Sequence, residues 1–178
     1  MQLHTSRLTL RPFRLEDVPD VTAYTMRPEF IRYLPLPPQT PASTAEFVRR
    51  AVDDGQPDKN SNWKFAIQIG EDPRLVGTIR VGIREAEHRQ GDVGYALNPD
   101  FWGRGIITEA LSCLLAFGFD ELDLMRIWAT ADARNIASWA VMERAGMKRE
   151  GLMRRHRFHQ GEWCDSVLYA AVAGDPGR

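Results

Sequence analysis

The stretch FWGRGIITEA, residues 101–110, holds two glycines, Gly103 and Gly105, separated by a single arginine. It lies between the strand-like run VGYAL (93–97) and the apolar run ALSCLLAFGF (110–119), which is typical of a helix packed on a sheet. A turn into a helix presents unpaired N–H groups at the positive end of the helix dipole, and glycines let a bulky anion approach that backbone. The pattern therefore indicates a phosphate or pyrophosphate site, although a tight strand-to-helix turn without a ligand has the same local signature.

The spacing of the glycines excludes two common phosphate-binding loops. No lysine follows the second glycine, so GxxxxGK[ST] is missing, and GRG does not continue to the third glycine that GxGxxG requires. The sequence therefore disfavours adenylate kinase and dehydrogenase chemistry.

Patterns on both sides of the turn predict a layered mixture of strands and helices. Strands are predicted at 3–13, 63–69, 75–83, 92–97, 126–130, 148–158 and 163–173. Helices are predicted from Asp17, from the capping box Ser43-Thr44-Ala45-Glu46 through Asp54, at 106–121, and at 138–145 with a closing Gly146; the proline-rich segment 27–41 is expected to be a loop with at most a short helix. This order predicts an α/β or α+β domain with a mixed, mainly antiparallel sheet.

Length and composition limit the remaining classes of protein. A chain of 178 residues with 43% apolar and 26% charged residues predicts one domain over residues 1–178. No apolar run reaches the length of a membrane span and the amino terminus lacks a secretory pattern, so we expect a cytoplasmic protein without a membrane partner. A net charge of -1 gives no general attraction to nucleic acid. Cys113 and Cys164 are isolated thiols, and no metal site is predicted.

Four segments together resemble one known family. YALNPDFWGRGIITEAL (95–111) resembles the acyl-CoA motif of the GNAT superfamily of N-acyltransferases, in particular the RimJ/RimL branch of ribosomal-protein N-acetyltransferases. TSRLTLRPFRLEDV (5–18), ARNIASWAVMERAGMKREG (133–151) and GEWCDSVLYA (161–170) resemble the family's opening strand and helix, its second cofactor segment and its closing strand. The resemblance covers nearly the whole chain, in order. It implies a GNAT fold: a mixed, mainly antiparallel seven-stranded sheet flanked by about four helices and splayed between the fourth and fifth strands.

Two residues depart from the family's [QR]xxGx[GA] loop. Trp102 stands where glutamine or arginine is usual, and Ile107 stands where glycine or alanine is usual. The side chain of Ile107 would crowd a pyrophosphate if it pointed at the ligand. Because Ile107, Leu111 and Leu114 fall on one helical stripe, we expect it to point into the core.

The resemblance implies an acetyl-CoA-dependent N-acetyltransferase without a metal. Acetyl-CoA is the expected cosubstrate, and the acceptor is a primary amine of a protein N-terminus or of a small molecule, which attacks directly in a ternary complex. Neither cysteine lies in the two cofactor motifs or has a partner histidine close in sequence, so no covalent intermediate is expected. The implied acetyl-CoA contacts are Ala96, Leu97, Asn98, Gly103, Arg104, Gly105, Ile106, Ile107, Thr108, Asn135 and Ser138.

The resemblance also suggests which residues carry protons. Asn135 would orient the pantetheine arm, and Ser138 would donate to the departing thiolate directly or through water. Relatives outside this branch use a tyrosine four residues past the serine, where this chain has Met142. An Asn-x-x-Ser sequence at a helix start is also typical of plain capping.

For the general base, Asp92 at the start of the splayed strand is the first choice, acting through a water. The alternative is a solvated strand end beside Arg89. Glu109, in the first turn of a helix, is interpreted as structural. His156 and His159 are expected on an exposed hairpin face, not in a catalytic or metal pair.

Acceptor choice in this architecture falls to the early helices with their loop and to the final hairpin. Phe30, Tyr33, Trp63 and Trp163 are therefore candidates to line the acceptor cleft, with packing in the core as the alternative. Arginines in the run RRHRFH (154–159) would repel polyamines and attract acidic acceptors or the donor's phosphates. The C-terminal strand would allow a homodimer.

Two other classes of protein remain as alternatives. A noncatalytic acyl-CoA-binding or sensing protein of the same fold would keep the pyrophosphate turn and lose the transfer groups. An RNA-binding module using RRHRFH is disfavoured, because the chain has no RRM or KH signature and no basic overall charge.

Overall fold

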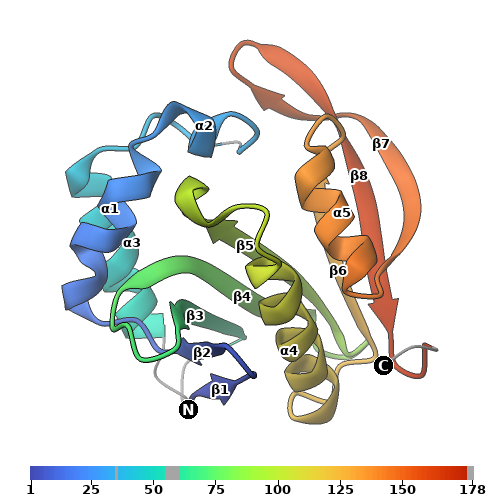
Figure 1. Ribbon diagram of the computed structural model, residues 1–178. Helices are drawn as coiled ribbons and strands as arrows, with labels where there is room; N and C mark the ends of the chain where they lie inside the picture. The colour runs from blue at the N-terminus through green and yellow to red at the C-terminus, as the bar shows by residue number, and fades with distance from the viewer. Residues whose placement is uncertain (35, 55–60, 176–178) are drawn as a thin grey trace.

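The computed structural model describes residues 1–34, 36–54 and 61–175, and these form one eight-stranded sheet flanked by helices (Figure 1). The order across the sheet is β1-β2-β3-β4-β5-β6-β8-β7. Among the described strands, β5 and β6 are parallel and the other neighbouring pairs are antiparallel. The strands are β1 (Leu3–His4), β2 (Leu8–Arg11), β3 (Asn62–Ile69), β4 (Leu75–Glu85), β5 (Gln90–Leu97), β6 (Arg126–Asp132), β7 (Lys148–His159) and β8 (Glu162–Val172). The mixed, mainly antiparallel sheet that we expected is confirmed.

Five α-helices lie in the described residues: α1 (Val18–Thr25), α2 (Pro28–Ile31), α3 (Pro41–Asp54), α4 (Ile106–Asp120) and α5 (Ile136–Arg144). Short 3₁₀ turns at Leu15–Asp17 and Pro99–Phe101 precede α1 and α4. The helix α2 is the single turn allowed for in the proline-rich loop, and it begins with Pro28 at its first position, where the missing N–H costs nothing.

The first strand is a hairpin, which explains why the sheet has eight strands where we expected seven. Residues 3–13 do not form one continuous strand, because Thr5 interrupts them. Its backbone N–H donates to the carbonyl of Leu8 over 3.0 Å, and its hydroxyl accepts the N–H of Leu8 over 2.9 Å. Pro12, which has no N–H to donate, follows the last residue of β2.

The capping box lies one turn earlier than predicted. The hydroxyl of Thr40 accepts the N–H of Ser43 over 3.1 Å, and the hydroxyl of Ser43 accepts the N–H of Thr40 over 2.9 Å. The fixed φ of Pro41 suits the first position of a helix, and α3 begins at this residue, two residues before Ser43. Glu46, predicted as part of the box, instead pairs with Arg50.

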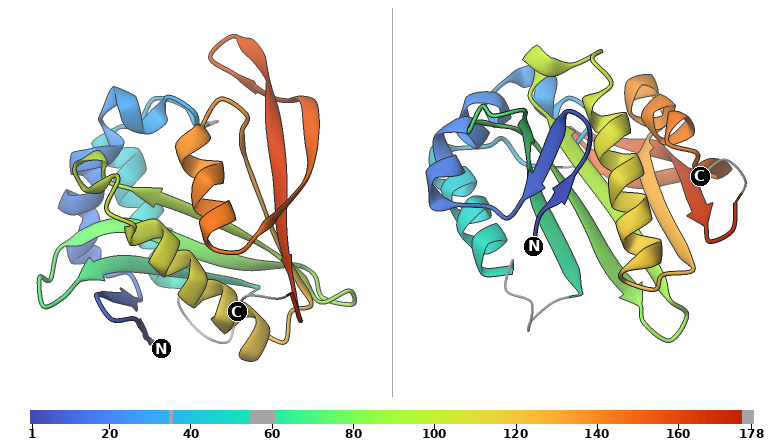
Figure 2. Two further views of the ribbon diagram at one scale, coloured as in Figure 1. Left: turned by 45° about the vertical axis from the view of Figure 1, so that its right-hand side comes forward. Right: turned by 60° about the horizontal axis from the view of Figure 1, so that its bottom comes forward.

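The helices cover the two faces of the sheet unequally (Figures 1 and 2). On one face, α4 and α5 cover the main core, to which β5 contributes Val93 and Leu97. On the other face, α1 and α3 pack Val21 and Val48 against β3 and β4. Side chains alternate along a strand, so Asp92 on β5 lies on the face away from α4. Ile107 is buried in the main core, as expected.

The strands β5 and β6 separate after a short parallel contact. Pairing joins Gln90 with Arg126, Gly91 with Ile127 and Asp92 with Trp128, and within the described residues it goes no further along the two strands. The splay implied by the sequence is therefore confirmed at these strands, which are fourth and fifth if the opening hairpin counts as one. From residue 93 onward, this edge of β5 has no neighbouring strand among the residues that the structure describes. No helix in the described part of the chain is long and apolar enough to cross a lipid bilayer.

Candidate active site

The turn between β5 and α4 exposes a row of backbone amides. Gly103 and Gly105 have φ of 75° and 73°, in the left-handed region that favours glycine, and Gly105 caps α4. A Cβ on Gly103 would meet nothing within 4 Å, so the space beside it is open. In the described structure no hydrogen bond uses the backbone N–H groups of residues 103–108. These amides are open donors at the positive end of a 15-residue helix.

Neighbouring side chains fix this turn from the outside. The carboxylate of Glu109 accepts the hydroxyl of Thr5 over 2.5 Å and Nε of Arg7 over 2.7 Å, so Glu109 is structural, as interpreted from its position. Arg7 also donates to the carbonyl of Arg104 over 3.3 Å. The indole N–H of Trp102 donates to the carbonyl of Leu97 over 3.0 Å, which ties the turn to the end of β5.

The residues of the turn fit a pyrophosphate through backbone and not through side chains. The guanidinium of Arg104 donates to the carbonyl of Asp100 over 2.9 Å and lies 5.2 Å from the ring centroid of Phe101. The side chains of Ile106 and Ile107 are buried, which leaves their amides to contact a ligand. Asn98 ends β5 and accepts the N–H of Asp100 over 3.0 Å. The buried side chain of Ile107 points into the core, as expected, and does not crowd this space.

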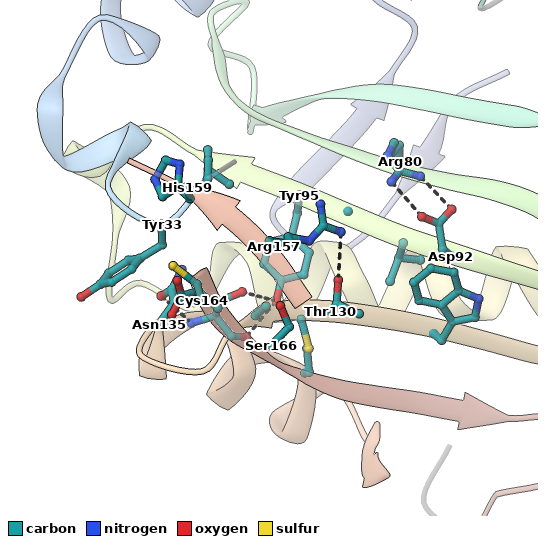
Figure 3. Close-up of a pocket in the computed structure, with 18 residues that line it drawn as sticks. Tyr33, Arg80, Asp92, Tyr95, Thr130, Asn135, Arg157, His159, Cys164 and Ser166 are labelled. Carbon is teal, nitrogen blue, oxygen red and sulfur yellow. Dashed lines mark hydrogen bonds and ion pairs between the residues drawn. The ribbon is translucent and has the colours of Figure 1, made fainter. Parts of the chain in front are cut away.

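A cavity of about 210 Å³ lies where β5 and β6 diverge (Figure 3). Its wall includes Asp92 to Tyr95 of β5 and Thr130 to Asp132 of β6. Helix α5 contributes Ser138 and Met142, and the β7–β8 hairpin contributes Arg157, His159, Cys164 and Ser166. The cavity is bordered by side chains from both faces of the sheet: the face that α4 and α5 cover, and the opposite face, on which α1 and α3 pack against β3 and β4.

Ser138 and Asn135 lie at this cavity at the start of α5. Their roles toward acetyl-CoA stay predictions. Asn135 caps the helix, since its side-chain oxygen accepts the N–H of Ser138 over 3.2 Å. The phenol of Tyr95 donates to the carbonyl of Ser138 over 2.8 Å and lies 3.1 Å from its hydroxyl. Burial raises the pKa of Tyr95 to about 12, against a small opposing effect of the Ser138 hydrogen bond, so the phenol stays protonated. Sequence reasoning missed Tyr95, which faces Ser138 from 43 residues away.

Asp92 is buried in an ion-pair network and is not a solvated strand end. Arg80 holds both carboxylate oxygens, over 2.9 and 2.8 Å, and Nε of Arg84 donates over 2.7 Å. Burial pushes the pKa of Asp92 up, but the hydrogen bonds and charges of Arg80 and Arg84 outweigh it and hold the pKa below its ordinary value. Arg89, the neighbour expected from the sequence, pairs with Asp123 instead. The role of Asp92 as general base stays a prediction, and these contacts weigh against it.

Of the four aromatic candidates for the acceptor cleft, Tyr33 lines the cavity. Phe30 packs edge-on against Tyr24 with ring centroids 5.1 Å apart, and Trp63 packs against Phe117 at 6.3 Å, so both belong to cores. Trp163 is 60% exposed at the hairpin and contacts Phe158, outside this cavity.

The two hairpin histidines differ from each other. His156 is exposed, as expected. His159 is buried, lines the cavity and has Nε2 3.3 Å from the carbonyl oxygen of Arg32, which corrects its predicted exposed position. Within the described ranges, no group of three or more His, Cys, Asp or Glu side chains could hold a metal ion.

Residues 7–148 match the family model described as an acetyltransferase (GNAT) domain. The chain belongs to the GNAT acetyltransferase family. It is 30% identical over 170 residues to the uncharacterized N-acetyltransferase p20 of Bacillus licheniformis, covering 96% of this chain and 95% of the relative. It is 31% identical over 172 residues to the uncharacterized N-acetyltransferase YnaD of Bacillus subtilis, covering 97% of each. The crystal structure of a GNAT-family acetyltransferase from Bacillus anthracis superposes with a TM-score of 0.86 at 31% identity, covering 97% of this chain and 98% of that one.

As a GNAT acetyltransferase, this protein is an acetyl-CoA-dependent N-acyltransferase, and acetyl-CoA is its cosubstrate. The open amides at the start of α4 and the unpaired edge of β5 are the parts of the structure that fit this cosubstrate.

Proposed function

We propose that this GNAT acetyltransferase transfers the acetyl group directly to a primary amine, of a protein N-terminus or a small molecule, while acetyl-CoA and the amine are bound together. The observation that carries this proposal is the cavity between β5 and β6. It has the hydroxyls of Tyr95 and Ser138 on the side of α5 and Arg157 on the side of the hairpin. Two reactants can therefore enter from opposite faces of the sheet and meet at the gap.

The donor end of the site is built mainly from backbone. The amides of 103–108 would hold the pyrophosphate, and the free edge of β5 would pair with the pantetheine arm. An N–H of that edge would polarise the thioester carbonyl, which places oxyanion stabilisation on the backbone. The proposed donor contacts remain Ala96, Leu97, Asn98, Gly103, Arg104, Gly105, Ile106, Ile107, Thr108, Asn135 and Ser138.

Acetyl-CoA supplies the acetyl group as a thioester, whose C–S bond breaks as the C–N bond to the amine forms. The sulfur leaves as a thiolate and needs one proton. Tyr95 and Ser138 form a neutral hydroxyl pair that can provide it and recover it from solvent. The amine loses one proton as the amide forms. We propose that water on the face of the sheet away from α4 accepts this proton, because Arg80 and Arg84 already occupy the carboxylate of Asp92.

Direct attack is also favoured by the state of the cavity's cysteine. Cys164 lines the cavity, and burial raises the pKa of its thiol. A neutral thiol is a poor nucleophile, so an acyl-cysteine step is disfavoured.

Initial-rate kinetics with both substrates varied test this proposal. Release of coenzyme A is followed with a thiol reagent over a panel of amino acids, polyamines and short peptides. Intersecting double-reciprocal lines are expected for a ternary complex, and parallel lines would overturn direct attack. Isothermal titration calorimetry provides a second readout: tight acetyl-CoA binding with no turnover on any amine would favour the sensing protein, and no binding would reject the enzyme.

The names of more distant relatives span two classes of acceptor. The spermidine N(1)-acetyltransferase of Escherichia coli is 21% identical over 160 residues, and the [ribosomal protein uS5]-alanine N-acetyltransferase of the same organism is 30% identical over 88 residues. We keep the RimJ/RimL-like branch, one domain over residues 1–178, a cytoplasmic location and a possible homodimer as predictions. A single sheet to which both ends of the chain contribute strands supports the prediction of one domain.

A further inference from the structure

We propose that the acceptor of this enzyme is a small primary amine that carries a carboxylate close to its nitrogen, and that Arg157 binds this carboxylate. The proposal rests on the proposed function, because it concerns the acceptor side of the same cavity. It would place the enzyme among those that act on amino acids and would exclude polyamines.

The first support is the charge balance of the cavity wall. Each carboxylate there already has a cation: Asp92 is held by Arg80 and Arg84, and Asp132 is held by Arg134 with 2.8 Å between Oδ2 and Nη2. Arg157 has no carboxylate partner within the described residues. The lining itself holds two arginines, Arg80 and Arg157, and two aspartates. When Arg84, Arg134 and Glu162, which shares Arg134, are counted with them, four arginines face three carboxylates. The one excess positive charge is at Arg157, and it attracts an anionic acceptor and repels a polycation.

The second support is the free hydrogen-bonding capacity of Arg157. Its guanidinium is within 3.5 Å of the hydroxyl of Thr130, a weak contact, and the part of the chain that the structure describes offers it no other hydrogen bond (Figure 3). A guanidinium has five N–H groups in a planar fork that matches a carboxylate. Arg80 shows this geometry nearby, since its two terminal nitrogens hold the two oxygens of Asp92 (Figure 3).

The third support is a bulge that selects which arginine reaches the cavity. Met153 pairs with Ser166, but the next registered pair on that side is Arg157 with Cys164, so β7 has two extra residues there. In a regular strand Arg155 would stand opposite Cys164. Instead, Arg155 adopts a φ of 50° and its N–H donates to the carboxylate of Asp165 over 2.8 Å. Bulges of this kind redirect side chains next to sites, and here the bulge places Arg157 on the cavity wall.

The size of the cavity favours a small acceptor. Its 210 Å³ must also admit the acetyl end of the donor. Pockets for drug-sized ligands are about 300–1,000 Å³, so the acceptor space corresponds to a molecule of amino-acid size. Tyr33 and His159 line the same cavity.

Arg157→Gln tests the proposal with matched acceptors, each an amino acid and its carboxamide. Conversion to the amide lowers the pKa of the amine and makes more of it neutral, so the chemistry alone favours the amide. We expect the wild type to prefer the acid, and Arg157→Gln to lower kcat/KM for the acid by about 10- to 100-fold, the usual effect of losing a hydrogen bond between charged groups. The change for the amide should be less than about threefold, and Arg157→Lys should recover part of the loss.

Arg154→Gln is the matched control, because it removes the same charge from an exposed position of the same strand that does not line the cavity. It should leave the ratio of acid to amide unchanged. Acetyl-CoA affinity, measured by calorimetry, should be the same in all three variants.

Three results would overturn the proposal. The first is an active wild-type enzyme whose kcat/KM is higher for polyamines or for amino-acid amides than for the amino acids. The second is an unchanged acid-to-amide ratio in Arg157→Gln. The third is a loss of acetyl-CoA affinity in that variant, which would assign Arg157 to the donor's phosphates. Binding of acetyl-CoA without turnover on any amine would overturn the proposed function, and this inference with it.

Discussion

The phenol oxygen of Tyr95 lies 2.8 Å from the carbonyl oxygen of Ser138 and 3.1 Å from its hydroxyl. This contact bridges the gap between the free edge of β5 and the first turn of α5. Because burial raises the pKa of Tyr95 to about 12, the phenol donates to the carbonyl and can accept from the hydroxyl at every pH near neutrality. The Ser138 hydroxyl therefore has a hydrogen-bond partner on the strand that would carry the thioester.

If Tyr95 and Ser138 supply one proton together, removing either hydroxyl should lower kcat nearly as much as removing both. Tyr95→Phe and Ser138→Ala are each expected to lower kcat by about 10²-fold, the lower end for proton donors, and the double variant should be little worse than the poorer single one. Steady-state kinetics with a saturating amine measure this. If the losses of kcat in the two single variants multiply in the double variant, or if kcat does not fall, the two hydroxyls do not act as a unit. Melting temperatures and acetyl-CoA affinities of the variants check that the fold and the donor site are intact.

A methyl group on the glycine turn should weaken acetyl-CoA binding. Gly105→Ala forces a side chain into a left-handed conformation at a cost of about 1–2 kcal/mol, and so strains the backbone that presents the open amides. The added Cβ would lie 3.6 Å from Nη2 of Arg7, which helps to hold this turn. Gly146→Ala is the control: it imposes the same backbone strain, with φ of 86° and open space around the added Cβ, but Gly146 follows the C-terminal end of α5. We expect similar losses of unfolding free energy, with the acetyl-CoA dissociation constant raised about tenfold or more in Gly105→Ala alone. Equal affinities in the two variants would remove the turn from the donor site.

The parts of the fold that follow local patterns could be predicted from the sequence. The hairpin of β3 and β4, the helix α4 and the closing hairpin follow from periodic apolar residues between turn residues. The hairpin at Thr5 was missed because it depends on hydrogen bonds between Thr5 and Leu8 that leave the alternation of side chains intact. The cap of α3 was misplaced because Thr40-Pro41 competes with Ser43 for the same helix start.

The glycine turn at the start of α4 was predictable for the same reason, since its glycines and its helix are adjacent in the sequence. Contacts between strands were not. Asp92 meets Arg80 and Arg84 through the register of β4 with β5, and Arg157 reaches the cavity only because of a bulge. Phe30 and Trp63 were assigned to the acceptor cleft because an aromatic residue that packs in a core has the same sequence signature as one that lines a site.

Asp92 should contribute stability but no titration to the rate. Its pKa in the folded protein is lowered, so the stabilising effect of the ion pairs is fully present above the unfolded value of about 3.9 and is lost as the pH falls through the folded value. Asp92→Asn should therefore cost roughly 1.5–3 kcal/mol of unfolding free energy between pH 5 and 8, and this difference should shrink below about pH 4. Denaturant unfolding across pH measures it.

The same variant tests the base. If water takes the amine proton, Asp92→Asn should lower kcat by less than about tenfold between pH 5 and 9, because a general base contributes about 10²–10⁴-fold. A loss of about 10²-fold or more, with the acetyl-CoA affinity unchanged, would return the role of general base to Asp92.

The most destabilising single change outside the cavity should be at the buried pair of Arg11 and Asp17. Both side chains are at most 4% exposed, their atoms approach to 2.9 and 2.7 Å, and Asp17 also accepts the N–H of Arg14 over 2.8 Å. Asp17→Asn leaves a guanidinium buried without a counter-charge, which costs about 3–5 kcal/mol. The exposed pair of Asp72 and Arg74 is the control, because solvent screens this pair and Asp72→Asn should lower the free energy of unfolding far less than Asp17→Asn does. Replacing Arg11 by Met in the Asp17→Asn background removes the stranded charge and should restore part of the loss. Urea unfolding of the wild type and these three variants measures the effects. Equal losses at Asp17 and Asp72, or no recovery in the double variant, would mean that the pair anchoring the start of α1 to β2 holds the fold by shape and not by charge.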